Sequence, residues 1–252
     1  MEKETLDLWY AFPADFGQQD TFARSLALLS EGERQKAQLF KADASRHEYV
    51  AAHTLVRTAL SYGEPVAPEA WRFRTNNFGK PHVDPACDLF FSLSRRSGLA
   101  ACLVAGGGEV GVDVESHGRA GEILDIAHRV FSPSELAQLD RMSHDDKLDH
   151  ALSLWTLKEA YSKARGQGFS LPMQRFSFLR CPGEGIRLEV EASIGADAAC
   201  WQFCLLDHAG YRVALMSERR PVPRLRVWEM RPQEPSFLPV AVRAVWHPPV
   251  PE

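Results

Sequence analysis

The chain has 252 residues, which is enough to bury a large core in one big domain or in two small ones. It carries 29 Lys and Arg against 33 Asp and Glu, and the formal net charge of -4 gives no general attraction to nucleic acid or to an anionic membrane. Residues 1–7 lack the apolar region of a signal peptide, and the longest apolar run, residues 99–104, is far shorter than the ~20 residues of a membrane span. We expect no nucleic-acid partner and no membrane partner.

Five cysteines are present, and no two of them form a Cys-x-x-Cys pair. Cys102, Cys200 and Cys204 stand among apolar residues, and an odd number of cysteines does not fit a closed disulfide framework. We therefore predict buried free thiols and a cytoplasmic protein.

The first part of the chain alternates strand and helix signals. Residues 6–10 alternate in hydrophobicity and predict a strand. Ser30 and Glu33 have the spacing of a capping box, which predicts the start of a helix. A second helix is expected over about residues 44–61, and Gly63 ends it.

A loop and three short strands follow. Gly79 and Pro81 predict a fixed loop that presents Lys80. The strands are expected at residues 89–94, 99–104 and 109–115. Because the connections between them are short and contain glycine, we predict an antiparallel meander.

The rest of the chain repeats the mixture of helix and strand. Ser132 and Glu135 form a second capping box, with Pro133 at the first helical position. We interpret residues 142–149 as a polar linker that leads into a helix over residues 152–166. Further strands are expected at residues 175–179, 186–192, 200–206 and 211–216, with one more near residues 225–228 in a Pro-rich tail.

The two halves resemble each other when the chain is shifted by 102 residues. That shift places Ser30 on Ser132 and Glu33 on Glu135, and it places Thr54 on Thr156. Two capping boxes can coincide by chance, but agreement over the whole order of elements favours an internal duplication. We therefore predict similar halves at residues 1–108 and 109–220 with a site in the cleft between them, and a Pro-rich extension at residues 221–252.

The predicted strand at residues 109–115 carries two acidic residues on one face. Asp113 and Glu115 point to the same side as Gly111, with Cα atoms about 7 Å apart. Taken alone, such a pair is better explained by a solvent-exposed polar face. In the functional interpretation Gly111 leaves room for a ligand, and oxygen donors without nearby His or Cys favour Mg²⁺ over zinc.

The helix over residues 152–166 carries a charged stripe. Trp155, Glu159 and Lys163 are spaced i, i+4 and i+8, and Lys158 stands beside them. The simplest interpretation is an ordinary surface pair of Glu159 and Lys163. Alternatively, Glu159 is a third carboxylate of a metal site that leaves positions for phosphate oxygens and water.

Scattered cations suit a diphosphate next to such a metal, although each alone is more often a surface charge. The candidates are Arg46, Lys80, Arg95, Lys158 and Lys163. The chain has no Walker-type loop, since the glycines at 106–108 are not followed by Lys-Ser.

Several motifs together resemble a known family. They are Gly-Val-Asp113-Val-Glu115, Phe131-Ser-Pro-Ser-Glu135-Leu, Trp155-Thr-Leu-Lys158-Glu159-Ala-Tyr-Ser-Lys163, and Gly79-Lys80-Pro81 ahead of Phe91-Ser-Leu-Ser94. In order and spacing they look like the motifs of 4'-phosphopantetheinyl transferases of the surfactin-synthetase (Sfp) type, over roughly residues 5–220.

The resemblance implies a pseudo-twofold α+β monomer that holds coenzyme A and Mg²⁺ between its halves. It implies transfer of the 4'-phosphopantetheine arm to a serine of an acyl or peptidyl carrier protein, with release of adenosine 3',5'-bisphosphate. Two other hypotheses stay open at this point. One is a degenerate relative that binds coenzyme A or a carrier protein without turnover, and the other is a Mg²⁺-dependent phosphohydrolase.

The same resemblance assigns roles to single residues. Asp113, Glu115 and Glu159 would hold the metal, and Glu159 would take the proton of the carrier serine directly or through water. Lys158 and Lys163 would bind the diphosphate, with Asp113, Lys158 and Glu159 as the catalytic group. The residues implied for coenzyme A, besides the acid and lysines already named, are Arg46, Lys80, Pro81 and Ser94.

One position departs from the family pattern. The family often has His after the strand that ends near Ser94, and this chain has Arg95. Arginine is always cationic and binds phosphate in a bidentate way, so phosphate binding is expected to survive the exchange. Arg119, Arg129 and Arg165 are candidates for a basic face that docks the carrier protein, because carriers of this class are typically acidic.

Overall fold

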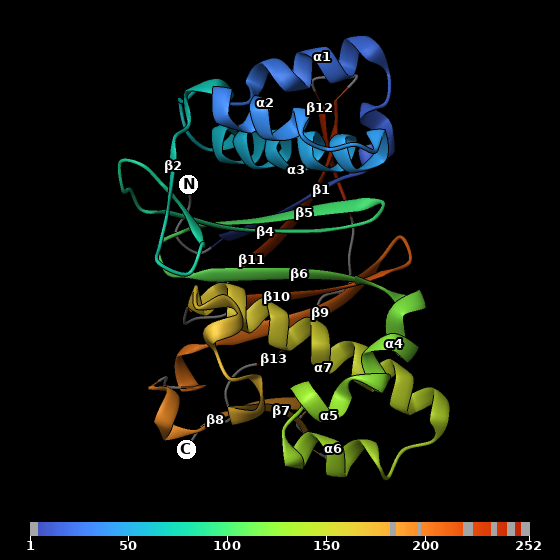
Figure 1. Ribbon diagram of the computed structural model, residues 1–252. Helices are drawn as coiled ribbons and strands as arrows, with labels where there is room; N and C mark the ends of the chain where they lie inside the picture. The colour runs from blue at the N-terminus through green and yellow to red at the C-terminus, as the bar shows by residue number, and fades with distance from the viewer. Residues whose placement is uncertain are drawn as a thin grey trace. The chain divides into compact units, whose positions relative to one another are not determined.

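The computed structural model describes residues 5–181, 185–195, 198–218, 224–232, 236–240 and 245–247. Two compact units are formed, and each combines a sheet with helices (Figure 1). The first unit holds residues 1–75, 81–107 and 224–242, and the second holds residues 76–80, 108–223 and 243–252. The predicted α+β class, with small sheets packed by helices, is confirmed.

The sheet of the first unit has five strands in the order β12-β11-β1-β5-β4. Their bounds are β1 Thr5–Ala11, β4 Leu89–Arg96, β5 Leu99–Gly106, β11 Arg224–Arg231 and β12 Ser236–Pro239. Neighbours pair antiparallel except for β1 and β11, which are parallel. A small separate hairpin joins β2, Phe73–Thr75, to β3, Pro81–Val83.

Three α-helices cover this sheet, and α3 lies between the sheet and the other two (Figure 1). They are α1 Gln19–Leu28, α2 Glu31–Gln38 and α3 Asp43–Tyr62, with short 3-10 turns at Pro13–Phe16 and Pro68–Ala70. The apolar face of α3 includes Leu55 and Leu60, and it packs in one buried cluster with Trp9 and Cys102 of the sheet. The predicted helix over residues 44–61 is confirmed, whereas α1 has no counterpart among the predicted helices.

The sheet of the second unit has four antiparallel strands in the order β13-β9-β10-β6. Their bounds are β6 Val110–Ser116, β9 Gln202–His208, β10 Tyr211–Ser217 and β13 Val245–His247. A hairpin of β7, Phe176–Cys181, and β8, Gly185–Val190, forms a separate two-stranded sheet.

The helices of the second unit are dominated by α7, His144–Arg165, which packs against β6 and β10. The others are α4 Ala120–Asp125, α5 Ala127–Val130 and α6 Pro133–Leu139, with 3-10 turns at His117–Arg119, Gly168–Ser170, Met173–Arg175, Ala192–Ile194 and Ala198–Cys200. Leu154, Leu157 and Tyr161 of α7 are buried in the core of this unit, as their spacing predicts.

The order of elements is the same in both units. Each runs from a strand through short helices to one long helix, then through a hairpin to two more strands. The pairing repeats as well, because β5 lies between β1 and β4 as β10 lies between β6 and β9. Two capping boxes precede the two long helices, at Ser30 with Glu33 and at Ser132 with Glu135. This repetition is what an internal duplication predicts.

The predicted three-stranded meander is wrong in its last strand. β4 and β5 pair antiparallel as expected, but β6 pairs with β10 in the sheet of the second unit. Gly107 and Gly108 have positive φ angles of 76° and 82°, which lead the chain out of the first sheet instead of closing a tight hairpin. A short glycine connection does not by itself decide which strand the chain pairs with next.

The predicted linker over residues 142–149 is also wrong, because α7 begins at His144. The backbone N–H of Asp146 donates to the side chain of Ser143 at 3.3 Å, which caps the helix at its start. At the other end Gly166 adopts a left-handed conformation with φ 63° and terminates the helix, as expected.

The described parts of the Pro-rich tail include strands of both sheets. Its predicted strand near residues 225–228 is confirmed as β11, which pairs with β1. Arg226 donates from Nε and Nη2 to the two carboxylate oxygens of Asp7, both at 2.7 Å, and Asp7 is buried. This bidentate pair fixes the register of the parallel strands.

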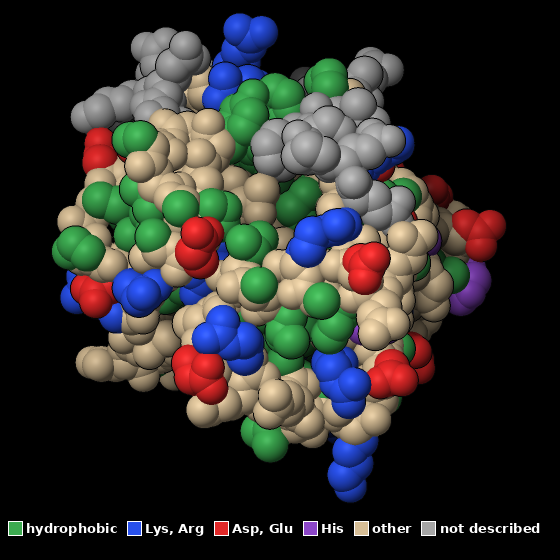
Figure 2. All heavy atoms as spheres, turned by 90° about the horizontal axis from the view of Figure 1, so that it is seen from above, with side chains coloured by type: hydrophobic (Ala, Val, Ile, Leu, Met, Phe, Trp, Pro, Cys, Tyr) green, Lys and Arg blue, Asp and Glu red, His purple; other side chains and the backbone are tan. Residues whose placement is uncertain are grey.

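The cysteines are all free, and Cys102 and Cys204 are buried as predicted. Cys200 is exposed, which corrects its prediction as a buried thiol. None of the helices in the described ranges combines the length and hydropathy that crossing a bilayer requires. On the described part of the face in Figure 2, basic and acidic side chains are interspersed, in keeping with a small net charge.

Candidate functional site

The acidic face of β6 lies against α7 in the second unit. Asp113 and Glu115 are both buried, with 6% and 4% of their surface exposed. A Cβ atom added to Gly111 would lie 2.0 Å from the carbonyl oxygen of Ala160, so the glycine lets the strand approach the helix backbone. The space at Gly111 is therefore filled by α7, which corrects the prediction that a ligand occupies it.

Glu115 receives two hydrogen bonds on one oxygen atom. Its Oε1 accepts from Nη1 of Arg119 at 2.7 Å and from Nε1 of Trp155 at 2.9 Å. The first donor comes from the turn that follows β6, and the second comes from α7. Glu115 is thus held in one orientation by a cation and a neutral donor.

Asp113 forms an ion pair with a lysine of the same helix, α7. Nζ of Lys163 donates to its Oδ1 at 2.7 Å, and the lysine side chain is 30% exposed. Trp155 and Lys163 both reach β6, so the charged stripe of α7 faces the strand and is not a solvated surface. Glu159 lies midway between them on the stripe and is partly buried.

The predicted metal ligands are not gathered into one cluster. Within the described ranges, no three His, Cys, Asp or Glu side chains lie close enough together to hold a metal ion as they stand. The donor chemistry nevertheless fits Mg²⁺, which is commonly bound through one or two carboxylates plus water and substrate phosphates. Asp113 and Glu115 supply such a pair, and each already accepts from a cationic side chain.

Lys158 is completely buried, and its side chain joins α7 to α6 and to the backbone at the start of β7. Its ammonium pairs with Oε2 of Glu135 at 2.8 Å and donates to the carbonyl oxygens of Met173 and Phe176 at 2.7 and 2.6 Å. Burial lowers the pKa of Lys158, and the charge of Glu135 partly offsets this. Three acceptors use the three N–H donors, which corrects the prediction that Lys158 reaches a diphosphate.

Lys80 is also engaged within the second unit. Its Nζ pairs with Oε2 of Glu109 at 2.5 Å and donates to the carbonyl oxygens of Val110 and Ala164 at 3.2 and 2.8 Å. Burial lowers the pKa of Lys80, and Glu109 partly offsets this. The fixed loop predicted at Lys80 is real, but its ammonium joins β6 to the end of α7 instead of standing exposed.

The remaining predicted residues belong to the first unit. Arg46 donates to Oδ1 of Asp43 at 2.9 Å and to the carbonyl oxygen of Phe40 at 3.0 Å. Ser94 is buried in β4, and the next residue, Arg95, is exposed with its guanidinium carbon 5.8 Å from the ring centre of Tyr49. Pro81 begins β3.

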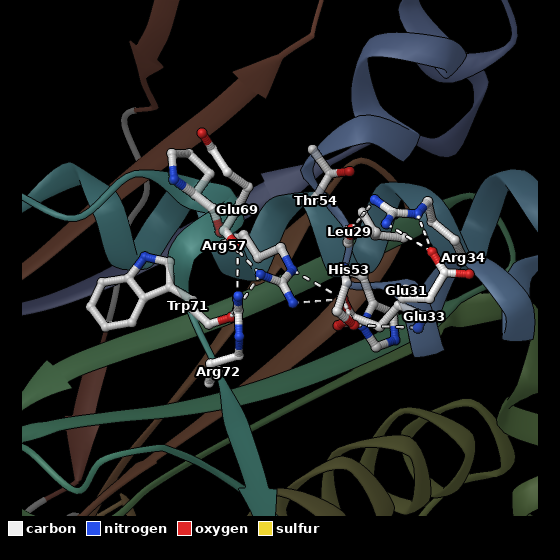
Figure 3. Close-up of polar contacts among 12 residues, drawn as sticks. Leu29, Glu31, Glu33, Arg34, His53, Thr54, Arg57, Glu69, Trp71 and Arg72 are labelled. Carbon is white, nitrogen blue, oxygen red and sulfur yellow. Dashed lines mark hydrogen bonds and ion pairs between the residues drawn. The ribbon is translucent and has the colours of Figure 1, made fainter.

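A second ion cluster, in the first unit, was missed by sequence reasoning. Glu33 accepts from Nε and Nη2 of Arg57 at 3.1 and 2.6 Å, and its other oxygen lies 2.9 Å from Nδ1 of His53 (Figure 3). Burial alone would raise the pKa of Glu33, but the hydrogen bonds of His53 and Ser30 outweigh it and lower the pKa to about 2. The capping box predicted the place of Glu33, but no local signal predicted its partners.

The first unit also contains a cavity of about 490 Å³. Trp71, Val83 and Leu89 form apolar parts of its wall, and Asp84 and Asp88 add carboxylates. None of the predicted site residues lines this cavity.

Comparison with known proteins gives one consistent result. Residues 109–216 match the sequence model of the 4'-phosphopantetheinyl transferase superfamily. The chain is similar to a 4'-phosphopantetheinyl transferase of Bacillus subtilis, with 32% identity over 165 residues that cover 66% of this chain and 71% of the relative. It is 29% identical to the transferase Sfp of Bacillus subtilis (strain 168) over 159 residues, 63% of this chain and 70% of Sfp. A third relative, the transferase ffp of Bacillus subtilis, is 26% identical over 210 residues, 81% of this chain and 89% of ffp.

Proposed function

Because the chain belongs to the 4'-phosphopantetheinyl transferase superfamily, we propose that it transfers the 4'-phosphopantetheine arm of coenzyme A to a serine of an acyl or peptidyl carrier protein. The second product is adenosine 3',5'-bisphosphate. The observation that carries the proposal is the buried pair Asp113 and Glu115, set against the Trp155, Glu159 and Lys163 stripe of α7.

The acidic residues bind a divalent cation in this proposal. Asp113 and Glu115 offer hard oxygen donors from one strand face, and Glu159 adds a third from α7. These residues would hold Mg²⁺, and the ion would supply positive charge to offset the charge of the diphosphate and of the leaving bisphosphate. The pair at Asp113 and Glu115 supports this role because both carboxylates already lie beside a cationic group.

Lys163 binds a diphosphate oxygen. It is the one lysine of the α7 motif whose side chain is partly exposed, since Lys158 is completely buried. Its contact with Asp113 keeps the ammonium at the acidic face of β6. A point charge held there lowers the energy of the developing charge without reorganising during the reaction.

Glu159 accepts the proton of the carrier serine. The serine oxygen forms a bond to the β-phosphorus of the diphosphate, which is the phosphorus that carries the pantetheine arm. The bond from that phosphorus to the bridging oxygen breaks, and the electron pair leaves with adenosine 3',5'-bisphosphate. A partly buried carboxylate on the stripe of α7 suffices as the base, because positioning and charge neutralisation carry most of this type of reaction.

Coenzyme A contacts in the first unit complete the proposal. Arg46, Pro81, Ser94 and Arg95 are assigned to the cofactor. The exposed guanidinium of Arg95 offers a bidentate contact to a phosphate group, where the family often has His. We also propose that the protein is a monomer and that it is cytoplasmic, and the five free cysteines support the second point.

The test is intact-mass spectrometry of a panel of apo carrier proteins incubated with coenzyme A and Mg²⁺. We expect a mass gain of one phosphopantetheine arm, and none on a carrier whose acceptor serine is replaced by alanine. Asp113→Asn and Glu159→Gln are expected to slow transfer by about 10²–10³-fold, the range for removing one preorganised charge-stabilising group. Arg141→Gln, at an exposed arginine, is the control and should transfer at the wild-type rate.

Two other results would overturn the proposal. Binding of coenzyme A without transfer to any carrier would indicate a binding module. Release of free phosphate without an acceptor protein would indicate a phosphohydrolase.

A further inference from the structure

Arg119 forms ion pairs with two carboxylates that differ in their exposure to water. Its Nη1 donates to Oε1 of Glu115 at 2.7 Å, and its Nε donates to Oε2 of Glu122 at 2.9 Å. Arg119 is the last residue of the turn that follows β6, and Glu122 lies three residues further on in α4. The guanidinium therefore holds one acid of the candidate site and one acid outside it.

The two partners differ in their access to water. The side chain of Glu115 is 5% exposed, that of Glu122 is 69% exposed, and that of Arg119 is 28% exposed. An ion pair with a buried carboxylate is screened less by water and salt than one with an exposed carboxylate. The ion pair with Glu115 is therefore the stronger of the two, and the ion pair with Glu122 is the weaker one.

We infer that Arg119 is a built-in counter-cation that competes with the divalent metal for Glu115 and moves onto Glu122 when the metal binds. This rests on the proposed function, because it assigns a regulatory contact to the same acidic site. A guanidinium and Mg²⁺ repel each other when both contact the same carboxylate, so each weakens the contact of the other with Glu115.

Arg119 can keep one ion pair when it loses its contact with Glu115. Its Nε already donates to Glu122, so rotation of the guanidinium keeps one ion pair while it releases Glu115. Glu115 stays oriented meanwhile, since Nε1 of Trp155 donates to the same oxygen from α7. A lysine at position 119 would lack this second attachment geometry, because its ammonium is a single point charge.

The test is calorimetric titration of the full-length protein with Mg²⁺. Arg119→Gln removes the competitor and is expected to bind Mg²⁺ about three- to tenfold more tightly than the wild type. Glu122→Gln removes the alternative partner, and we expect it to bind Mg²⁺ about two- to threefold more weakly. Arg141→Gln changes the net charge as Arg119→Gln does, at an exposed site, and should match the wild type.

A purely structural clamp predicts different results. If Arg119 only joined β6 to α4, Arg119→Gln would bind Mg²⁺ no more tightly than Arg141→Gln, and the inference would be overturned. If Arg119→Gln fails to fold, Glu122→Gln decides, because an unchanged or tighter Mg²⁺ affinity in that variant contradicts the competition.

The failure of the proposed metal site gives a separate signature. Asp113→Asn is expected to abolish the Mg²⁺ titration of the wild type. If it leaves the titration unchanged, the metal assignment of the proposed function fails, and the role of Arg119 fails with it. If Asp113→Asn abolishes binding while Arg119→Gln and Glu122→Gln both equal the wild type, only the competition is wrong.

Discussion

The two units contain the same ion-pair arrangement with different cations. In each, the glutamate of a capping box pairs with a buried cation of the next long helix, Arg57 with Glu33 and Lys158 with Glu135. Each cation also donates to two backbone carbonyls in the segment after its helix. Figure 3 shows the arrangement of the first unit. The repeated order of elements thus extends to a buried ion pair.

The difference between the pairs lies in how completely the charges are enclosed. The side chain of Glu33 is 13% exposed and is shared with His53, whereas Glu135 and Lys158 are both 0% exposed. The comparison also explains the wrong prediction for Lys158. Like Arg57, it neutralises the glutamate of a capping box and donates to backbone carbonyls, so its contacts in this structure support the helix.

The acidic residues are where the units diverge. When the hairpin turns at Gly98 and Gly210 are matched, Trp9 stands where Asp113 stands, since they pair with Cys102 and Ala214 respectively. In the first unit this face is closed by aromatic packing, with Trp9 stacked on Trp228 at 5.5 Å between ring centres. The order of elements repeats in both units, but Trp9 and Ala11 stand at the positions of Asp113 and Glu115. The carboxylate that the first unit has on this face, Asp7, is paired with Arg226.

The free energies of unfolding of variants that lack one cation test how much the fuller burial of the Lys158–Glu135 pair matters. Lys158→Met leaves Glu135 buried and unpaired, and we expect a loss of about 3–5 kcal/mol in the free energy of unfolding. Arg57→Met should cost about 2 kcal/mol, because Glu33 keeps His53 and some contact with water. Urea denaturation checks both values.

The matched control for Lys158→Met is Lys147→Met in the same helix. Lys147 lies 3.6 Å from Asp140 in a partly exposed pair, so its loss should change the free energy of unfolding by less than about 0.5 kcal/mol. Equal losses for Lys158→Met and Arg57→Met would contradict the comparison.

Lowering the pH should destabilise the protein through a second buried ionisable group of the second unit, His150. His150 is fully buried, neither ring nitrogen has a hydrogen-bond partner in the described ranges, and burial lowers its pKa to about 4, with Arg180 contributing. The unfolded chain therefore takes up the proton first, and stability falls as the pH drops from about 6.5 towards 4, by about 3 kcal/mol. Above pH 6.5 the full stability is present.

Denaturant titrations at several pH values check this prediction. His150→Leu should remove the extra loss between pH 6.5 and 4, while His144→Leu, at an exposed residue of the first turn of α7, should retain it. The prediction is wrong if His150→Leu and wild type lose stability in parallel over that range.

The close approach of β6 to α7 gives the last effect in this series, which is similar in size to that of Arg57→Met. Gly111→Ala places a Cβ against the backbone of Ala160 and forces strand and helix apart, at a cost of about 2 kcal/mol. The matched position of the first unit holds Asp7, whose side chain is accommodated by Arg226. Gly121→Ala, in open space on α4, is the control and should not destabilise the protein.

Local patterns predicted the elements and their faces. The two capping boxes, the strand that carries Asp113 and Glu115, and the stripe of α7 follow from spacings of two to four residues, which fixed dihedral geometry turns into shared faces. The resemblance added the family, which the comparisons bear out.

Two of the wrong predictions depend on distant partners. The pairing of β6 with β10 joins residues about a hundred positions apart, and no local pattern encodes that choice. The burial of Lys158 requires acceptors from α6 and from the segment before β7, so its sequence neighbours alone suggested a surface cation. The contact of Arg119 with Glu115 has ordinary i, i+4 spacing, and spacing alone did not separate it from a solvated pair.

The central claim is that the acidic face of β6 holds the divalent cation of the reaction. Anomalous diffraction from crystals grown with Mn²⁺ and coenzyme A tests it directly, because Mn²⁺ takes the oxygen ligands of Mg²⁺ and scatters strongly. We predict one peak about 2.0–2.3 Å from carboxylate oxygens of both Asp113 and Glu115. A peak bound elsewhere, with these two carboxylates still held by Lys163 and Arg119, would contradict the account.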